Sequence, residues 1–271
     1  MLEHYLTQKD RLPKLKRYAA LGKNDSFRKK LNYLTTLAEP EKWHLLDEAS
    51  GYENTIIYQY IFNTFDRCFM QGKIYIDQIK ENSFFNTGLM DSQGNEIMGH
   101  FTKSELYNEF DCNSNYWFFN SFIKANDRDF LSKCKEKPEI ATYYDDFNET
   151  YFNPNLEIEL NFDHIYDDNY SRLPDELRLL DKEMARQVFL GFVEYAKKKI
   201  KRNDRIVVPQ YYKNKITFLI PIIIFNNKTV IVAVERINNV YIGNTVLTKE
   251  MAYNCARLIN KQETNWLLSE S

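Results

Sequence analysis

The sequence predicts an α+β protein with antiparallel sheets, in which a long helix precedes a C-terminal meander of strands and a closing helix follows it. Apolar residues recur at helical spacing over residues 177–196. Strand-like segments at 205–212, 215–225 and 229–236 then follow one another across short turns. A run of strands after a helix, without alternating βα units, is typical of an α+β fold and excludes a doubly wound one.

Residues 1–72 are predicted to form a helical and basic N-terminal region, separate from an α+β domain over residues 73–271. Asp25 or Ser26 can cap the first long helix of this region, because their side chains accept hydrogen bonds from free backbone amides at a helix start. Pro40 then ends that helix, since proline has no amide hydrogen to continue it.

A second helix is predicted over about residues 53–70, with Gly72 closing it. From Lys73 the apolar residues alternate with polar ones, and this period of two predicts strands. The predicted strands are 74–76, 84–89, 96–101 and 116–122, with a turn at 91–95. The polar, acidic stretches 103–115 and 124–160 are expected to hold insertions or loops.

The long helix is predicted to begin at Pro174 and to end near Arg202, in a lysine-rich last turn that suits the helix dipole. A fourth strand at 240–246 and a helix from Thr248 to about Asn260 complete the chain. The residues of the long helix expected to face the core are Leu177, Leu180, Met184, Val188, Phe192, Tyr195 and Ala196.

The composition is that of an ordinary globular protein, with 44% apolar and 27% charged residues in 271. The longest apolar run, Phe218–Phe225, is too short to cross a bilayer, so no membrane span is expected. The four cysteines lie far apart without a CxxC pair, and the first residues contain no apolar signal segment. These observations predict reduced thiols and a cytoplasmic location.

Charge is unevenly distributed although the net charge is only −2. Residues 1–30 contain nine Lys and Arg against three acids, whereas residues 141–183 contain twelve acids against three Lys and Arg. This asymmetry indicates either a basic nucleic-acid arm beside an acidic face, or two solvated surfaces that attract each other. The second interpretation is preferred, because charge runs usually solvate a face.

Several well-known sites are excluded by their missing motifs: GxGxxG, the P-loop GK[ST], HExxH, GxSxG and the EF-hand run. The histidines His4, His44, His100 and His164 lack metal-ligand spacing, so no metal is predicted. No cofactor is indicated by any motif. Each cysteine is expected to be a small core residue rather than a nucleophile.

The candidate functional residues are polar ones that interrupt strands or precede the long helix. Asn86 and Thr87 stand before Gly88 in an aromatic strand, and they indicate either a β-bulge or a site for a phosphate or base edge. Asn169 and Arg172 lie just before the predicted start of the long helix, where a positive charge is unfavourable. Either an anion bound at the helix start or an acidic partner such as Asp167, Asp168 or Asp175 would offset the charge of Arg172.

Further candidates lie in the meander and in the last helix. Gln210 follows Pro209 inside a strand and precedes Tyr211, where its amide faces solvent or a ligand. Glu235 ends an otherwise apolar strand, and if buried it requires a partner such as Arg172 or Arg257. His164 is an acid–base candidate, although a lone histidine is more often structural.

With these residues in view, the sequence resembles DUF3825, a bacterial family of unknown function, over about residues 73–268. The resemblance implies no established activity. Relatives of this kind occur fused to cold-shock-like and OST-type winged-helix modules, which are associated with RNA. The resemblance therefore implies an RNA-linked role through these fused modules rather than through any known chemistry. The matching stretches are 85–89, Asn169 with Arg172 and Pro174, 208–212, 219–221, 234–235, Tyr241 with Gly243 and Thr245, and 247–258.

The first hypothesis is a nucleotide- or RNA-associated protein with a polar cleft, which as an enzyme would hydrolyse a phosphoester or nucleotide. Arg172 would hold the phosphate, and Glu235 or His164 would act as the base. The alternative is a non-catalytic RNA-binding or protein-interaction module in which the same residues form a structural network. A homo-oligomer is a third hypothesis. The proposed cleft residues are Asn86, Thr87, His164, Arg172, Gln210 and Glu235, with Asn169, Tyr211 and Arg257 as further binding residues.

Overall fold

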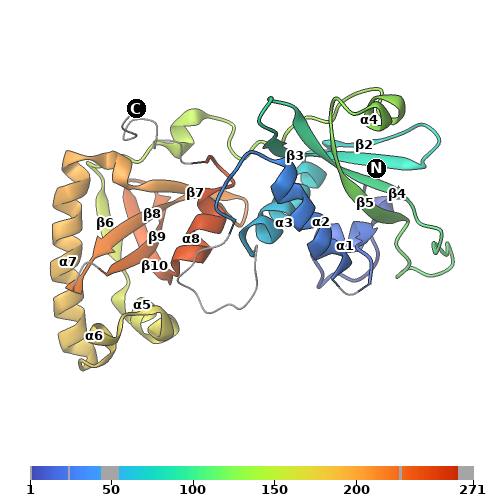
Figure 1. Cartoon of the computed structure of the whole chain (residues 1–271). Coiled ribbons are helices and arrows are strands. Elements are labelled where there is room, and N and C mark those ends of the chain that lie inside the picture. Colours follow the sequence, from blue (N-terminus) through green and yellow to red (C-terminus); the bar gives the residue numbers. More distant parts are fainter. Residues whose placement is uncertain (1, 24, 44–54, 226–227, 262–271) are drawn as a thin grey trace. The chain divides into compact units, whose positions relative to one another are not determined.

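The computed structural model describes residues 2–23, 25–43, 55–225 and 228–261. The chain forms two compact units, Met1–Thr142 and Tyr143–Ser271, each built around its own five-stranded sheet (Figure 1). Among the described residues, no helix combines the length and apolar character that crossing a bilayer requires.

The sheet of the first unit has the strand order β1-β5-β4-β3-β2. Strands β2 to β5 form an antiparallel meander, whereas the short β1 joins β5 in parallel. The strands are β1 (Ala19–Ala20), β2 (Ile74–Ile76), β3 (Asn82–Met90), β4 (Glu96–Lys103) and β5 (Trp117–Lys124).

Two helices, α2 (Ser26–Leu37) and α3 (Thr55–Met70), cover one face of this sheet, with α2 against β5 and α3 against β3. Their buried stripes, such as Phe27, Leu31 and Leu34 on α2, recur at helical spacing. The smaller elements are η1 (Leu2–Tyr5), α1 (Lys14–Tyr18) and α4 (Arg128–Lys133).

On the opposite face of the first sheet, α4 places Phe130 against Phe84, their ring centroids 5.1 Å apart. This small second core also contains Met98 and Cys134. The sheet is therefore packed on both faces, with the larger core under α2 and α3.

The second unit has the strand order β6-β10-β9-β8-β7. Strands β7 to β10 form an antiparallel meander, and β6 joins β10 in parallel. The strands are β6 (Glu157–Leu160), β7 (Val208–Tyr212), β8 (Lys215–Ile223), β9 (Thr229–Ile237) and β10 (Val240–Leu247).

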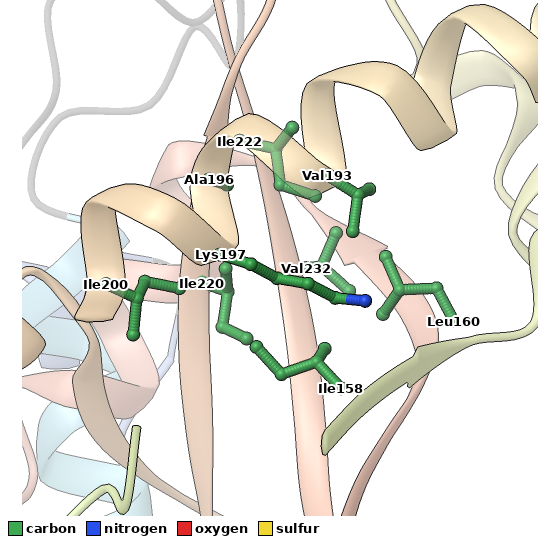
Figure 2. Close-up of a pocket in the computed structure, with 9 residues that line it drawn as sticks. All are labelled: Ile158, Leu160, Val193, Ala196, Lys197, Ile200, Ile220, Ile222 and Val232. Carbon is green, nitrogen blue, oxygen red and sulfur yellow. The ribbon is translucent and has the colours of Figure 1, made fainter. Parts of the chain in front are cut away.

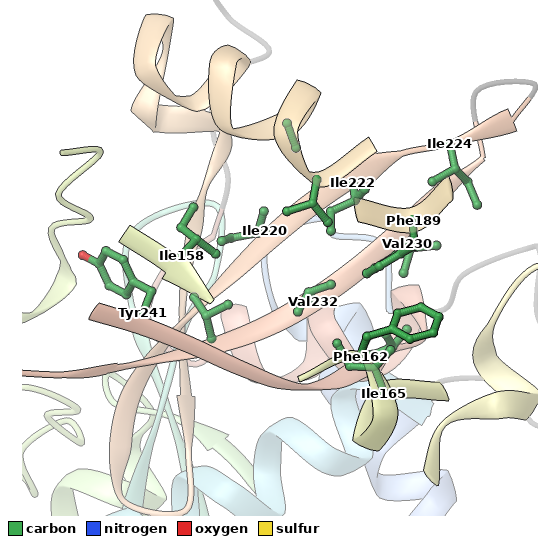
Figure 3. Close-up of a cluster of buried hydrophobic side chains, with 14 of the residues drawn as sticks. Ile158, Phe162, Ile165, Phe189, Ile220, Ile222, Ile224, Val230, Val232 and Tyr241 are labelled. Carbon is green, nitrogen blue, oxygen red and sulfur yellow. The ribbon is translucent and has the colours of Figure 1, made fainter. Parts of the chain in front are cut away.

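The long helix α7 (Lys182–Arg202) packs on β8 and encloses the core of the second unit, whereas α8 (Lys249–Ala256) packs against β7 (Figure 1). Figure 3 shows alternate residues of β8 and β9 entering this core, where Phe189 of α7 meets Phe162. The remaining elements are η2 (Phe147–Thr150), α5 (Phe162–Asp168), η3 (Tyr170–Arg172), α6 (Asp175–Arg178) and η4 (Asp204–Ile206).

The predicted fold class is confirmed, including the long helix before the meander and the closing helix. The sheets are mixed rather than purely antiparallel, because β1 and β6 join in parallel at one edge. The stretch 124–160, predicted as insertions or loops, contains α4 and η2 as well as β6. The first part of the predicted helix 53–70 lies outside the described residues.

The predicted start of the long helix was wrong. The helix that follows Pro174 is the short α6, and α7 begins after Asp181, whose carboxylate accepts a hydrogen bond from the amide of Met184 at 3.0 Å. An aspartate that caps a new helix start therefore divides the predicted helix into two.

The predicted core face of this helix was shifted by about one residue. Met184 and Tyr195 are 54% and 53% exposed, and the buried stripe instead consists of Ala185, Phe189, Val193, Ala196 and Ile200. Leu177 and Ala196 are buried as predicted. Val188, Phe192 and Leu180 are partly buried and pack against the edge of the core. The apolar face is therefore wider than the fully buried stripe.

The two units share one topology, which no repeat in the sequence indicates. Each has a first strand, then helices, then a four-stranded antiparallel meander whose last strand pairs in parallel with the first. The helix packing corresponds as well, because α3 packs on β3 as α7 packs on β8, and α2 on β5 as α5 on β10.

The correspondence extends to an irregularity in the last strand. Asn120 of β5 and Asn244 of β10 are each an extra residue against the preceding strand, which is the geometry of a β-bulge. Three residues before each asparagine stands a fully buried aromatic residue, Trp117 or Tyr241, which pairs with the parallel first strand. The two units are therefore two versions of one structural unit.

Candidate functional site

Asn86 and Thr87 form a bulge in β3 that is held by hydrogen bonds. The hydroxyl of Thr87 donates to the carbonyl oxygen of Ile97 at 2.6 Å, and the amide of Asn86 donates to Glu96 and to the carbonyl oxygen of Pro138, each at 3.2 Å. Both side chains are completely buried. Gly88 follows at φ +72°, in a conformation that glycine adopts without strain.

Arg172, Asn169 and His164 are brought together in the second unit. The guanidinium of Arg172 donates to the side-chain oxygen of Asn169 at 2.8 Å and to the carbonyl oxygen of Val246 at 2.9 Å. Asn169 is buried, and its amide donates to the backbone oxygen of His164 at 3.4 Å. Arg172 therefore ties the loop before α6 to the end of β10.

The imidazole of His164 is half-exposed and contacts its own helix rather than Arg172. Its Nδ1 lies 2.5 Å from Oδ2 of Asp168, one turn along α5. The acidic residues considered as partners of Arg172 have other contacts, since Asp167 pairs with Lys182 and Asp175 with Arg178. The arginine is satisfied by a neutral amide and a backbone carbonyl instead.

Gln210 is 2% exposed, and its side-chain amide donates to the hydroxyl of Thr217 on the neighbouring strand β8 at 2.9 Å. Its Oε1 has no hydrogen-bond partner among the described residues. The adjacent Tyr211 points its hydroxyl toward Asn214, donating at 3.0 Å. Gln210 is therefore a buried cross-strand residue of an edge strand rather than an exposed amide.

Glu235 pairs with Lys215, their charged atoms 2.6 Å apart, and both side chains are largely exposed at 41% and 62%. The conditional prediction of a buried Glu235 paired with Arg172 or Arg257 therefore does not apply. Arg257 lies at the C-terminal end of α8, where its amide donates to the carbonyl oxygen of Tyr253.

These residues do not form one cluster in the second unit. Arg172, Asn169 and His164 are linked, but no hydrogen bond or ion pair joins that group to Gln210 or Glu235 within the described ranges. Asn86 and Thr87 belong to the first unit. The four buried candidates, Asn86, Thr87, Asn169 and Gln210, each make at least one hydrogen bond within the protein.

The described part of the chain contains no candidate metal site, and two of its cysteines are buried thiols. No group of three His, Cys, Asp or Glu side chains there could hold a metal ion. Burial raises the pKa of Cys68 to about 12 and that of Cys134 to about 11, so neither thiol is readily ionised. The expectation that each cysteine is a core residue was wrong for Cys112, which is exposed.

The cations of α7 differ between its two ends, a contrast that the sequence alone does not reveal. In the first half, Lys182 pairs with Asp163 and Asp167 at 3.0 and 2.9 Å, and Arg186 lies 4.0 Å from Asp163. Beyond the middle, Lys198, Lys199, Lys201, Arg202 and Arg205 have no carboxylate partner among the described residues. We call these five residues the α7 basic end.

Lys197, which the sequence places in the same lysine run, lies partly buried against the sheet instead (Figure 2). Its aliphatic stem crosses a small apolar gap of about 10 Å³ beneath α7, lined by residues such as Val193, Ile220 and Val232. Its ammonium group pairs with Glu194 at 2.7 Å. A gap of this size holds at most one water molecule, so it is not a ligand site.

A second feature that sequence reasoning missed is a large open hollow in the first unit, of about 1030 Å³. It is bounded by η1, the end of α3, the edge strand β2 and the turn that follows β2; we call it the first-unit hollow. Its walls come from segments far apart in the sequence, such as Tyr5, Phe69 and Ile76, and no motif signals their meeting.

The class of protein that fold and site define is an α+β protein of two similar units, each with an antiparallel meander closed by a parallel strand. Residues 34–266 match the model of one family, described as a domain of unknown function, DUF3825. The chain therefore belongs to the DUF3825 family. No curated protein and no solved structure matched it.

Proposed function

We propose that this chain is a module that binds single-stranded RNA through the α7 basic end, with the buried polar residues forming a structural network. The observation that carries the proposal is a group of five cations without a carboxylate partner in the described structure, four at the end of α7 and Arg205 just beyond it. Such a stripe attracts the phosphate groups of a nucleic acid, and each phosphate that it binds releases a condensed counterion.

The helix dipole alone is a weaker explanation of this stripe. Cations near a helix C-terminus are each stabilised by about 0.3–1 kcal/mol, and the effect falls off within the last turn. Arg205 lies beyond the helix end, and four of the five residues are exposed. Like charges this close repel one another, so an anionic partner would lower the free energy of the folded unit.

An exposed aromatic ring adds a surface suited to a nucleic-acid base. Tyr195 is 53% exposed, and the ammonium group of Lys199 lies 4.9 Å from the centre of its ring. A base stacked on tyrosine is stabilised by about 1–3 kcal/mol whatever its identity, so the combination favours single strands without strong sequence preference.

The test is the salt dependence of binding to a fluorescent oligouridylate in the full chain and in Lys198→Glu/Lys201→Glu. We expect the double variant to bind about tenfold more weakly, with a salt slope shallower by about 1.4, because each phosphate that is no longer neutralised lowers the slope by about 0.7 for single strands. Unchanged affinity and slope would show that RNA does not bind at the α7 basic end.

The matched control is Lys23→Glu/Lys29→Glu, which changes the net charge by the same amount on exposed residues of the basic segment 1–30. The proposal expects this control to bind RNA like the unaltered chain. A weakening confined to the control would instead support the basic N-terminal segment as the nucleic-acid arm.

Hydrolysis of a phosphoester or nucleotide is the second candidate, supported by the contact of His164 with Asp168 at 2.5 Å. A carboxylate that holds one imidazole nitrogen leaves the other free to accept a proton from water. This candidate expects phosphodiesterase or nucleotidase activity that His164→Ala abolishes and Asp168→Asn lowers. If the unaltered chain binds RNA but hydrolyses neither RNA nor nucleotides, the hydrolase candidate is excluded and the RNA-binding proposal stands.

A further inference from the structure

The first-unit hollow combines apolar walls with charged residues, among them Lys14 and Lys80. Its floor includes Phe69, which is 6% exposed, and Ile74, which is 8% exposed, and Met70 stands at its edge with 49% exposed. A volume of about 1030 Å³ is slightly above the about 300–1,000 Å³ typical of sites for organic ligands, and the hollow is open to solvent.

Tyr5 provides a fixed aromatic wall. Its ring contacts those of Tyr116, Trp117 and Tyr18, with centroids 5.1, 5.6 and 6.3 Å away. Trp117 and Tyr18 are completely buried, so this cluster holds the Tyr5 ring in place before any ligand arrives. A flat ring entering the hollow would therefore stack without a large loss of side-chain entropy.

The rim carries charges of both signs, with two lysines that could hold an anionic group. Lys14 and Lys80 line it, and Lys14 also lies close enough to Asp66 to lower the pKa of that carboxyl group against the larger, raising effect of burial. Of the acids there, Asp77 keeps its negative charge while its carboxylate accepts hydrogen bonds from the amides of Glu81 and Asn82 at 2.8 and 3.0 Å. Glu3 is the remaining acid, and His4 lies beside it.

The first-unit hollow occupies the position in its unit that corresponds to the α7 basic end in the second unit. The hollow lies where α3 ends beside the edge strand β2, and the α7 basic end lies where α7 ends beside the edge strand β7. In the second unit five residues, 203–207, connect helix to strand, and Ile206 and Val207 of this connection pack into the core. In the first unit the connection has only three residues, 71–73, and the corner stays open.

We propose that the first-unit hollow binds a nucleotide, with the base against Tyr5 and Met70 and the phosphate between Lys14 and Lys80. An apolar body explains the walls, and an anionic group explains the two lysines. Aromatic stacking and a thioether contact both suit a heteroaromatic ring better than an alkyl chain. The site uses none of the residues of the α7 basic end. Nucleotide binding in the hollow can therefore be tested independently of RNA binding at α7.

The test is calorimetric titration of the full chain with adenosine 5′-monophosphate, adenosine, inorganic phosphate and laurate. The variant Met70→Glu places a carboxylate at the edge of the hollow, and the matched control Met90→Glu alters a methionine of nearly equal exposure, 47%, away from it. We expect the nucleotide to bind, Met70→Glu to weaken it about tenfold by charge repulsion, and Met90→Glu to leave it unchanged.

Adenosine and phosphate alone are expected to bind more weakly than the nucleotide, because each makes only part of the interactions. Equal affinity in the two methionine variants, or binding of laurate without binding of the nucleotide, would overturn the proposal. The variant Lys198→Glu/Lys201→Glu is expected to bind the nucleotide normally, so a failure here is distinguishable from a failure of RNA binding at α7.

Discussion

His100 is a buried neutral histidine whose surroundings define its protonation state. It is completely buried and stacks on Phe84, with ring centroids 4.5 Å apart and planes at 9°. Its Nδ1 accepts from the amide of Asn120 at 3.3 Å, so Nε2 carries the proton and donates to Asn82 at 3.0 Å. Burial lowers the pKa of His100 from 6.5 to about 4.

This shift predicts acid sensitivity of the first unit. The unfolded chain binds a proton at His100 below pH 6.5, but the folded chain does so only near pH 4, so stability is present at neutral pH and is lost as the pH falls. Nearby Lys133 lowers the pKa of His100 further, whereas Asp129 and Asp77 raise it. Between pH 7.5 and pH 5 we expect a loss of about 2 kcal/mol.

Urea unfolding at the two pH values checks this. His100→Gln should unfold with a smaller difference between pH 7.5 and pH 5 than the unaltered chain. His164→Gln, which alters a half-exposed histidine, should retain the full difference. Equal acid sensitivity in His100→Gln and the unaltered chain would assign the effect to other groups.

At the residue scale, sequence patterns found the unusual side chains but not their partners. Gln210 and Asn86 stood out because a polar residue in an apolar strand requires a hydrogen bond if buried. Their partners Thr217 and Pro138 could not be inferred, because strand register and loop placement decide which groups meet. The roles assigned to His164, Arg172 and Glu235 remain predictions.

The start of α7 depends on one side chain. Asp181 accepts a hydrogen bond from the amide of Met184, whereas Asp25, at the same position before α2, makes no such bond. Asp181→Ala should therefore lower the free energy of unfolding by about 1 kcal/mol, and Asp25→Ala should change it much less. Chemical denaturation monitored by circular dichroism measures both, and equal effects would contradict a capping role.

At the element scale, the positions of most helices and strands could be predicted because periodicity and turn residues are local signals. The division of the predicted helix at 174–202 could not, since a capping aspartate inside an apolar pattern is also a plausible surface residue. The parallel edges could not either, because the pairing of β1 with β5 and of β6 with β10 joins residues far apart in sequence.

At the scale of the molecule, the repeated topology suggests two cores that unfold separately. Gly99 in the first sheet and Gly243 in the second are matched probes, because a methyl group at either would meet a buried side chain at 2.0 Å (Phe85) or a partly buried one at 2.5 Å (Leu160). Each substitution by alanine should cost about 1–3 kcal/mol in its own unit only.

Scanning calorimetry of the full chain tests this expectation. Gly99→Ala should lower one unfolding transition and Gly243→Ala another, leaving the remaining transition in place. A single transition that both variants shift equally would show that the two units unfold together. The repeat could not be predicted, because the buried positions are equivalent only in size and pattern, as with Trp117 and Tyr241.

The parallel edge strands impose an order on how the chain acquires its structure. In each unit the strand that is synthesised first pairs only with the last strand of the meander. Ala19 of β1 pairs with Trp117 of β5, and Glu157 of β6 pairs with Val240 of β10. Closing such long loops carries an entropic cost before the strands pair, which slows folding. During synthesis, the first unit can therefore complete its sheet while the second is still being made, and truncation before β10 leaves β6 without its partner strand.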